Sequence, residues 1–195
     1  MNIYEEIMTQ RTLPDNAILI PDNASCVFRG VLFDVYQWQQ EMFDGSHGTF
    51  EMLRRPDTIA VVAIDDDGKI IACHEEQPGG VLRQNHIIAG RVNAEDATVL
   101  AAAKRETEEE VGYRFKNWRL LEVHQPISKM EWFIHAFVAW GEDGKVPVRH
   151  DAGEKIIEGR ADYLAVRDNN AHWSPKLEEF SSTEELMSYI QSQNT

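Results

Sequence analysis

Short runs of apolar and β-branched residues recur along most of the chain, and each of them predicts a strand. They lie at residues 26–38, 50–54, 57–64, 69–77, 118–126 and 131–140. The turn sequence DDDG at residues 65–68 separates two of them, which favours a β-hairpin there. Polar stretches at residues 141–155 and 169–176 are expected to be loops.

A different pattern fills residues 96–111, DATVLAAAKRETEEEV, where alanine and charged residues replace the β-branched ones. This composition, with an acid ahead of the apolar positions, predicts a helix. A second, amphipathic helix is predicted over residues 182–193, with Ser182 or Thr183 as its N-cap. Strands on both sides of one central helix indicate a mixed α+β fold.

Length and composition narrow the class of protein. The 195 residues suit one globular unit, and no apolar run approaches the roughly 20 residues of a membrane span. Residues 1–16 carry acids and lack the apolar stretch of a signal peptide, and Cys26 and Cys73 lack CxxC spacing. We therefore expect a cytoplasmic protein with no membrane contact and no disulfide framework.

The net charge of −14 comes from 33 acidic and 19 basic residues, and the basic residues are scattered along the chain. This distribution disfavours nucleic-acid binding, which needs a basic patch or stripe. An acidic surface also repels a phosphate-bearing substrate unless local arginines or a divalent metal neutralise it. For a protein with this charge, a metal site would therefore favour a phosphate-bearing substrate.

Four glutamates crowd into the stretch KRETEEEVGY at residues 104–113. At about 3.6 residues per turn, Glu106, Glu109 and Glu110 share one helix face, while Glu108 points elsewhere. Like charges at this spacing cost a few tenths of a kcal/mol per pair on an exposed helix. The stretch is therefore either a solvated helix face or a cation site, and three carboxylates suit Mg²⁺, which prefers oxygen ligands.

Residues 89–113, AGRVNAEDATVLAAAKRETEEEVGY, resemble the Nudix box. That pattern has a glycine, five residues, a glutamate, seven residues, and then R-E-U-x-E-E-x-G-U, in which U is apolar. Its second half falls on residues 105–113, with Thr107 and Tyr113 less aliphatic than the pattern asks. The preceding loop is one residue longer, so the acid after Gly90 is either Glu95 or Asp96.

The resemblance implies a site that binds Mg²⁺ or Mn²⁺. Glu106 and Glu110 would bracket one metal, Glu109 would hold a second metal or its water, and the Ala89 carbonyl would add a ligand. It also implies that Glu109 takes part in catalysis and that Arg105 supports it by orienting the glutamates.

Other residues are candidates for the water-activating base and for phosphate binding. In relatives that hydrolyse ADP-ribose, a glutamate of an equivalent loop serves as or supports the base, which points to Glu154, with Glu158 and Asp151 as alternatives. The arginines near the strands before the box, which can clamp phosphates bidentately, are Arg54, Arg55 and Arg83. A nucleobase would stack on an aromatic ring, for which the candidates are Trp38, Phe50 and Trp132.

The segment ahead of the box looks like the extra β-rich segment of ADP-ribose and nucleotide-sugar pyrophosphatases. This likeness implies a Nudix fold, a mixed sheet in an α/β/α sandwich, with a β-rich segment at 1–56 and the Nudix domain at 57–195. It also implies a homodimer formed through exchanged N-terminal strands.

The activity implied is Mg²⁺-dependent hydrolysis of a nucleoside diphosphate derivative, with ADP-ribose giving AMP and ribose 5-phosphate as the leading case. The sequence EEQP at residues 75–78 stands where those enzymes often carry an arginine, so the substrate stays open. Alternatives are another nucleotide sugar of the GDP-mannose kind, a nucleoside triphosphate, or a non-catalytic ligand-sensing module. A ligand-sensing module of this family usually lacks the metal-binding carboxylates, whereas this sequence has all three of them.

Overall fold

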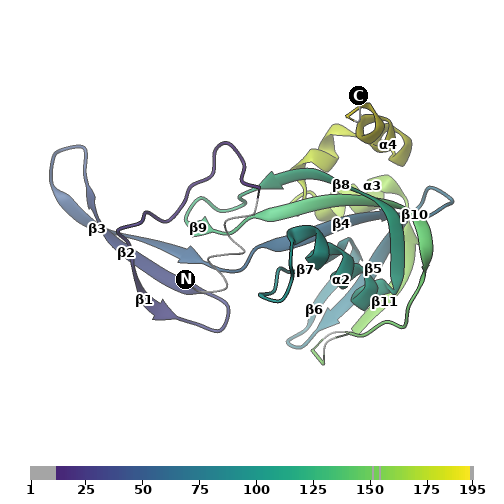
Figure 1. Ribbon diagram of the computed structural model, residues 1–195, viewed down its shortest axis with the longest axis horizontal. Helices are drawn as coiled ribbons and strands as arrows, with labels where there is room; N and C mark the ends of the chain where they lie inside the picture. Colours follow the sequence, from purple (N-terminus) through teal and green to yellow (C-terminus); the bar gives the residue numbers. More distant parts are fainter. Residues whose placement is uncertain (1–11, 151, 154, 194–195) are drawn as a thin grey trace.

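A seven-stranded mixed sheet forms the centre of the protein in the computed structural model, which describes residues 12–150, 152–153 and 155–193 (Figure 1). Five strands run in the order β11-β5-β4-β10-β8, while β6 pairs with β5 and β7 with β4. Only β4 and β10 are parallel among these pairs. The strands are β4 (Thr58–Ile64), β5 (Ile70–Gln77), β6 (Val81–His86), β7 (Ile88–Arg91), β8 (Tyr113–His124), β10 (Ile134–Lys145) and β11 (Lys155–Ala161).

Every residue of β4 is buried, because alternate side chains enter two separate cores. Ile59, Val61 and Ala63 pack towards α2 (Val99–Val111). The intervening residues pack towards α3 (Tyr163–Asn170), the 3₁₀ helix η1 (Pro175–Glu179) and α4 (Thr183–Ser192). The sheet is therefore covered by helices on both faces.

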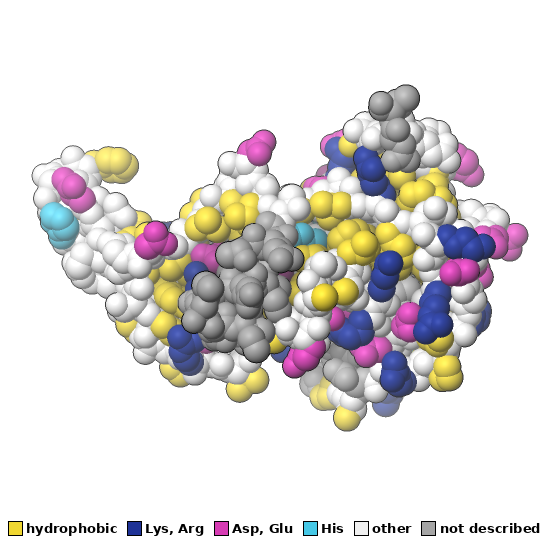
Figure 2. Space-filling model, viewed as in Figure 1, with side chains coloured by type: hydrophobic (Ala, Val, Ile, Leu, Met, Phe, Trp, Pro, Cys, Tyr) yellow, Lys and Arg dark blue, Asp and Glu magenta, His cyan; other side chains and the backbone are white. Residues whose placement is uncertain are grey.

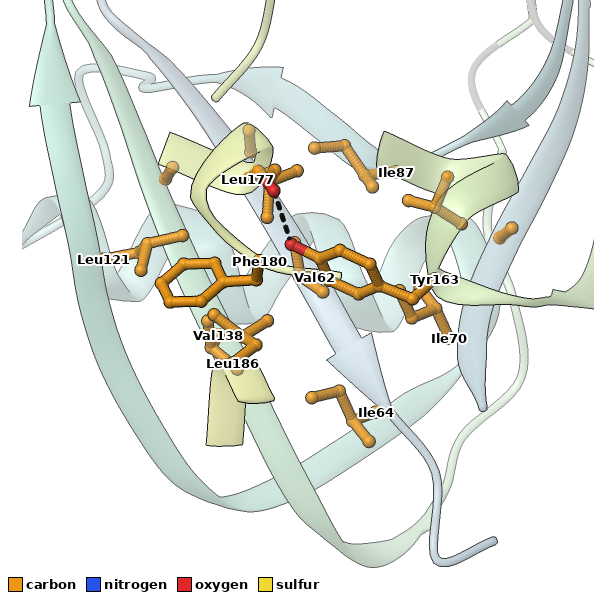
Figure 3. Close-up of a cluster of buried hydrophobic side chains, with 14 of the residues drawn as sticks. Val62, Ile64, Ile70, Ile87, Leu121, Val138, Tyr163, Leu177, Phe180 and Leu186 are labelled. Carbon is orange, nitrogen blue, oxygen red and sulfur yellow. Dashed lines mark hydrogen bonds between the residues drawn. The ribbon is translucent and has the colours of Figure 1, made fainter. Parts of the chain in front are cut away.

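The second of these cores is fixed by a polar anchor as well as by apolar contacts. The hydroxyl of Tyr163 donates to the carbonyl oxygen of Leu177 (2.7 Å), while Leu177, Phe180 and Leu186 pack beside Val62 of β4 (Figure 3). This bond ties α3 to η1, so the C-terminal helices form one layer.

A smaller sheet of the order β1-β2-β3-β9 projects from this body (Figure 1). It contains β1 (Ser25–Arg29), β2 (Asp34–Glu41), β3 (His47–Arg54) and β9 (Met130–Glu131). Within this smaller sheet the buried Glu131 of β9 links β3 to the segment before β1, because its carboxylate accepts from Arg54 (3.1 Å) and from the backbone N–H of Ile20 (2.7 Å). We keep a division after residue 56 as a proposal, since it falls between β3 and β4.

Several elements differ from those expected. The run at 26–38 divides into two strands at a turn where Gly30 N–H donates to Phe33 O (3.0 Å); a Cβ on Gly30 would lie 2.5 Å from that oxygen. Strands β6 and β7 and helix α3 were not predicted. Helix α2 begins at Val99, not at residue 96, because Thr98 is its N-cap and accepts from Ala101 N (3.0 Å).

The ends of the helices follow local chemistry. Helix α2 stops at Gly112, whose left-handed φ of 71° suits glycine and whose N–H donates to Glu108 O (3.1 Å). Of the two N-caps considered for α4, Ser182 is the one observed. None of the described helices is long and apolar enough to cross a membrane.

Candidate active site

The loop between β7 and α2 is fixed by Asp96. Its carboxylate accepts from the backbone N–H of Asn93 (2.8 Å), and its own N–H donates to Asn93 O (3.1 Å). Asp96 is buried, whereas Glu95 is exposed. Burial by itself raises the pKa of Asp96, but the bonds from Arg105 and Asn93 N–H outweigh it and lower that pKa below its usual value. Asp96 therefore fills the acidic position that the sequence left open.

Arg105 connects this loop to the glutamates of α2. Its Nε and Nη2 bond both oxygens of Asp96 (2.9 Å each), and Nη2 also reaches Arg91 O (2.9 Å). Its Nη1 bonds Glu106 (2.8 Å) and Glu109 (2.9 Å). The hydrogen bonds that Arg105 donates to Asp96, together with the nearby glutamates, raise the pKa of Arg105 further above its usual value. These bonds suit the orienting role that we expected of Arg105, which stays a prediction.

Glu106, Glu109 and Glu110 line one pocket of about 350 Å³. Glu108 is absent from the described lining and instead pairs with Arg114 (2.8 Å). Burial raises the pKa of the Cys73 thiol, as does Glu110 beside it, so this neutral thiol can donate to Glu110 Oε2 (3.8 Å). The spacing along α2 therefore places the same three carboxylates on the pocket wall as the sequence suggested.

The backbone of β7 forms the adjoining part of the pocket, at Ala89 and Gly90. A Cβ on Gly90 would lie 2.0 Å from the carboxylate carbon of Glu106, so glycine lets that carboxylate occupy its observed position. The carboxylates and the Ala89 carbonyl offer oxygen donors, which Mg²⁺ and Mn²⁺ accept.

These residues fit a divalent metal by donor type, while Arg105 now holds oxygens of Glu106 and Glu109. Within the described part of the chain, no three His, Cys, Asp or Glu side chains are arranged as a ligand cluster. A metal would therefore have to compete with Arg105 or use the other carboxylate oxygens.

Three arginines, Arg55, Arg91 and Arg149, also line the pocket. Within the part of the chain that the structure describes, none of the three forms an ion pair. The other arginines include seven that do pair with a carboxylate, namely Arg29, Arg54, Arg83, Arg105, Arg114, Arg160 and Arg167. The pocket thus presents guanidinium groups without a directly paired carboxylate in the described structure beside its glutamates, an arrangement suited to a phosphate that contacts the guanidinium groups and a metal held by the glutamates.

Arg54 and Arg55, which are neighbours in sequence and were both predicted to bind phosphate, lie in different surroundings. Arg55 lies over the ring of Trp132 (4.5 Å), and burial lowers its pKa, as does the nearby Arg91. Arg54 bonds Glu131 and Tyr36 and is absent from the described pocket lining. Arg83, which pairs with Glu75 (2.8 Å), is absent from it too. Of the three candidates, the structure brings only Arg55 to the glutamates.

The candidates for the base separate in a similar way. Glu154 and Asp151 lie outside the described residues. Glu158, on β11, accepts from the Tyr113 hydroxyl (3.0 Å) and from Arg160 (2.6 Å), and it is absent from the described pocket lining. Glu158 thus belongs to a network beside the pocket.

The segment just before residue 151 is attached to the end of α2. The N–H of Arg149 donates to Glu109 O (2.9 Å), and Nε2 of His150 donates to Glu110 O (3.0 Å). Both residues line the pocket, as do Arg91, Asn93 and Trp173, and sequence reasoning named none of them. Proximity to the Nudix-like stretch and to the loop of Glu154 was the available signal for four of them, whereas nothing in the sequence pointed to Trp173.

The aromatic candidates divide between the two parts of the protein. Trp38 and Phe50 pack against each other in the N-terminal sheet, with ring centroids 5.9 Å apart. Trp132 donates from Nε1 to the hydroxyl of Thr58 (2.9 Å) and supports Arg55. Trp132 therefore contacts two residues of the pocket lining, Thr58 and Arg55.

Three comparisons relate the chain to known proteins. A curated relative, the ADP-ribose pyrophosphatase of Bacillus subtilis (strain 168), is 27% identical over 114 residues, which cover 58% of this chain and 61% of that relative. A solved structure described as an ADP compounds hydrolase matches the fold with a TM-score of 0.65 and 20% identity, covering 88% of this chain and 94% of the other. The NUDIX domain model matches residues 54–181, well over half of the sequence, and the chain therefore belongs to the Nudix family.

Proposed function

We propose that this protein is a pyrophosphohydrolase that cleaves nucleoside diphosphate derivatives, with an ADP-sugar such as ADP-ribose as its leading substrate. AMP and ribose 5-phosphate would then be the products. The observation that carries the proposal is one pocket that combines three helix glutamates with three arginines lacking an ion pair in the described structure. The name of the B. subtilis relative supports the choice of substrate.

The cofactor we propose is Mg²⁺ or Mn²⁺, held by Glu106, Glu109, Glu110 and the Ala89 carbonyl. When bound, such a metal would polarise the phosphoryl group and favour ionisation of a water molecule. Arg105 would keep the glutamates in position through its bonds to Asp96 and Arg91 O.

The substrate's charge would be met by the arginine side of the pocket. Arg55, Arg91 and Arg149 would bind oxygens of the pyrophosphate, since guanidinium groups match the geometry of phosphate. Glu154 remains our proposal for the residue that takes the proton of the attacking water. Arg54 and Arg83 remain predictions for substrate binding, to be tested in the proposed homodimer. A cytoplasmic location likewise remains a prediction.

A substrate screen with product identification tests this function. The purified protein is incubated with ADP-ribose, other nucleotide sugars, dinucleoside polyphosphates and nucleoside triphosphates, each with Mg²⁺ or Mn²⁺, and the products are identified by mass. We expect AMP and ribose 5-phosphate from ADP-ribose, and no turnover after exhaustive chelation. If the protein prefers a nucleoside triphosphate, that compound becomes the proposed substrate in place of ADP-ribose. If none of the compounds is turned over, a non-catalytic ligand-sensing module becomes the favoured function.

A further inference from the structure

Trp173 lines the active-site pocket although it lies far from the glutamates in sequence. Its loop follows α3 and is held firmly: its N–H donates to Asn170 O (2.8 Å), while Ser174 Oγ and Lys176 N–H both donate to one oxygen of Glu122 (2.5 and 2.8 Å). The Asn170 amide also accepts from Ile87 N–H (3.1 Å) next to β7. These bonds fix the position of the loop and so hold the Trp173 indole beside the pocket.

Two residues of the pocket lining each carry a buried donor that has no acceptor among the described residues. These donors are Nε1 of Trp173 and Nε of Arg55. Buried polar groups are nearly always hydrogen-bonded, and an orphan donor is costly. Both donors belong to residues that line the same pocket, so a ligand rich in oxygen acceptors would satisfy them.

The histidines beside Trp173 add ring surface. His86 meets the indole edge-on, with centroids 5.5 Å apart and an interplanar angle of 87°. Burial lowers the pKa of His86 to about 4, so this ring is neutral at pH 7. Arg55, a cation of the same pocket lining, lies over the ring face of Trp132. The wall therefore joins an aromatic surface, a neutral donor and a guanidinium.

We infer that this wall is a subsite for a sugar phosphate, in which Arg55 binds the phosphate and Trp173 contacts the sugar. The indole N–H would donate to a sugar hydroxyl, and the ring would pack on the apolar C–H face of the sugar, as amphipathic aromatic rings do at wet sites. This inference rests on the proposed function. Both halves of ADP-ribose carry a ribosyl phosphate, so the experiment has to identify which half is bound.

Two substitutions separate the N–H from the ring. Trp173→Phe keeps an aromatic ring and removes the donor, and we expect kcat/KM to fall about 3- to 10-fold, the value of one neutral hydrogen bond. Trp173→Leu removes both features, for which we expect a loss of about 10- to 100-fold. In both variants KM should carry most of the change. Trp140→Phe is the matched control, because Trp140 packs on the C-terminal core outside the described pocket lining.

Product binding identifies the half of the substrate and stays informative if the activity differs from our proposal. Dissociation constants of AMP and of ribose 5-phosphate are measured by calorimetry with Mg²⁺ for the wild type and each variant. Weaker binding of one product, with the other within about twofold, supports the subsite and names its occupant. Unchanged binding of both, or equal weakening of both, would overturn it. A wild type that binds a product but does not turn over ADP-ribose would contradict the function and leave this test standing.

Discussion

Arg105 explains how three glutamates can stand on one helix face. Its guanidinium bonds Glu106 and Glu109 on one side and the buried Asp96 on the other. The repulsion between like charges at this spacing is a few tenths of a kcal/mol per pair on an exposed helix, so one such charge-assisted network is enough to offset it. Glu108 avoids the cluster by pairing with Arg114. The crowded glutamates therefore form a set of potential oxygen ligands, and Arg105 holds two of them in position.

Removing charge from these donors should abolish turnover without unfolding the protein. We expect Glu109→Gln and Glu110→Gln each to lower kcat by about two decades or more, as loss of metal-mediated charge stabilisation would. Helix propensity is nearly the same for glutamine and glutamate, so the melting temperature should hold. The matched control is Glu108→Gln, on the same helix but outside the described lining. Turnover near that of the wild type in both test variants would refute the metal-site assignment.

Gly90 offers an independent test of the same site. A methyl group there would meet the Glu106 carboxylate, whose carbon lies 2.0 Å from the ideal Cβ position. Because Glu106 is the flexible partner in this contact, Gly90→Ala should move the carboxylate and leave the fold intact. We expect weaker Mn²⁺ binding by calorimetry and a large loss of kcat, with little change in melting temperature. Unaltered metal affinity would show that Glu106 is not a ligand.

At the scale of elements, the long strands and the glutamate helix could be predicted from local patterns, whereas β6, β7, α3 and the tertiary contacts could not. The shared face of Glu106 and Glu110 follows from helical spacing, and the structure places both on the pocket wall. The approach of Trp173 and Arg149 depends on how α3 and the loop after β10 pack, which no local pattern records. Arg54 and Arg55 are adjacent in sequence, yet only the packing against Glu131 and Trp132 shows which one meets the pocket. The α+β Nudix fold itself is confirmed.

The loop that follows β10 is the element on which water activation should depend. Arg149 and His150 attach its first part to the carbonyl end of α2, directly before residue 151. We expect Glu154→Gln to lower kcat by about 10²- to 10⁴-fold, the usual contribution of a positioned base, with KM within a few-fold and metal affinity kept.

Two acids of the same region serve as controls for that substitution. Asp151→Asn should retain activity. Glu158→Gln should retain it too, with some loss of stability, because Glu158 bonds Tyr113 and Arg160. Retained activity in Glu154→Gln together with a large loss in either control would move the base to that residue. Activity in all three would leave water activation to the metal alone.

At the scale of the whole molecule, the N-terminal sheet leaves apolar side chains exposed. Val31 and Phe43 are fully exposed, and Val27 and Phe28 of β1 are more than half exposed. Apolar side chains are visible along this projecting part of the surface (Figure 2). The strand β1 also forms an edge of its sheet, where backbone groups can pair with another chain. A second copy of the chain would cover both features.

We therefore predict a homodimer held through the N-terminal strands. Light scattering at micromolar concentration should give about twice the 22.3 kDa of one chain. Placing a charge in the exposed apolar surface should dissociate the dimer, so Val31→Asp combined with Phe28→Asp should give the mass of one chain while circular dichroism stays unchanged. Leu164→Asp introduces the same charge on α3, at a residue that is 47% exposed, and should leave the dimer intact. A monomer mass for the wild type would contradict the assembly, and a dimer that survives the double substitution would move the interface elsewhere.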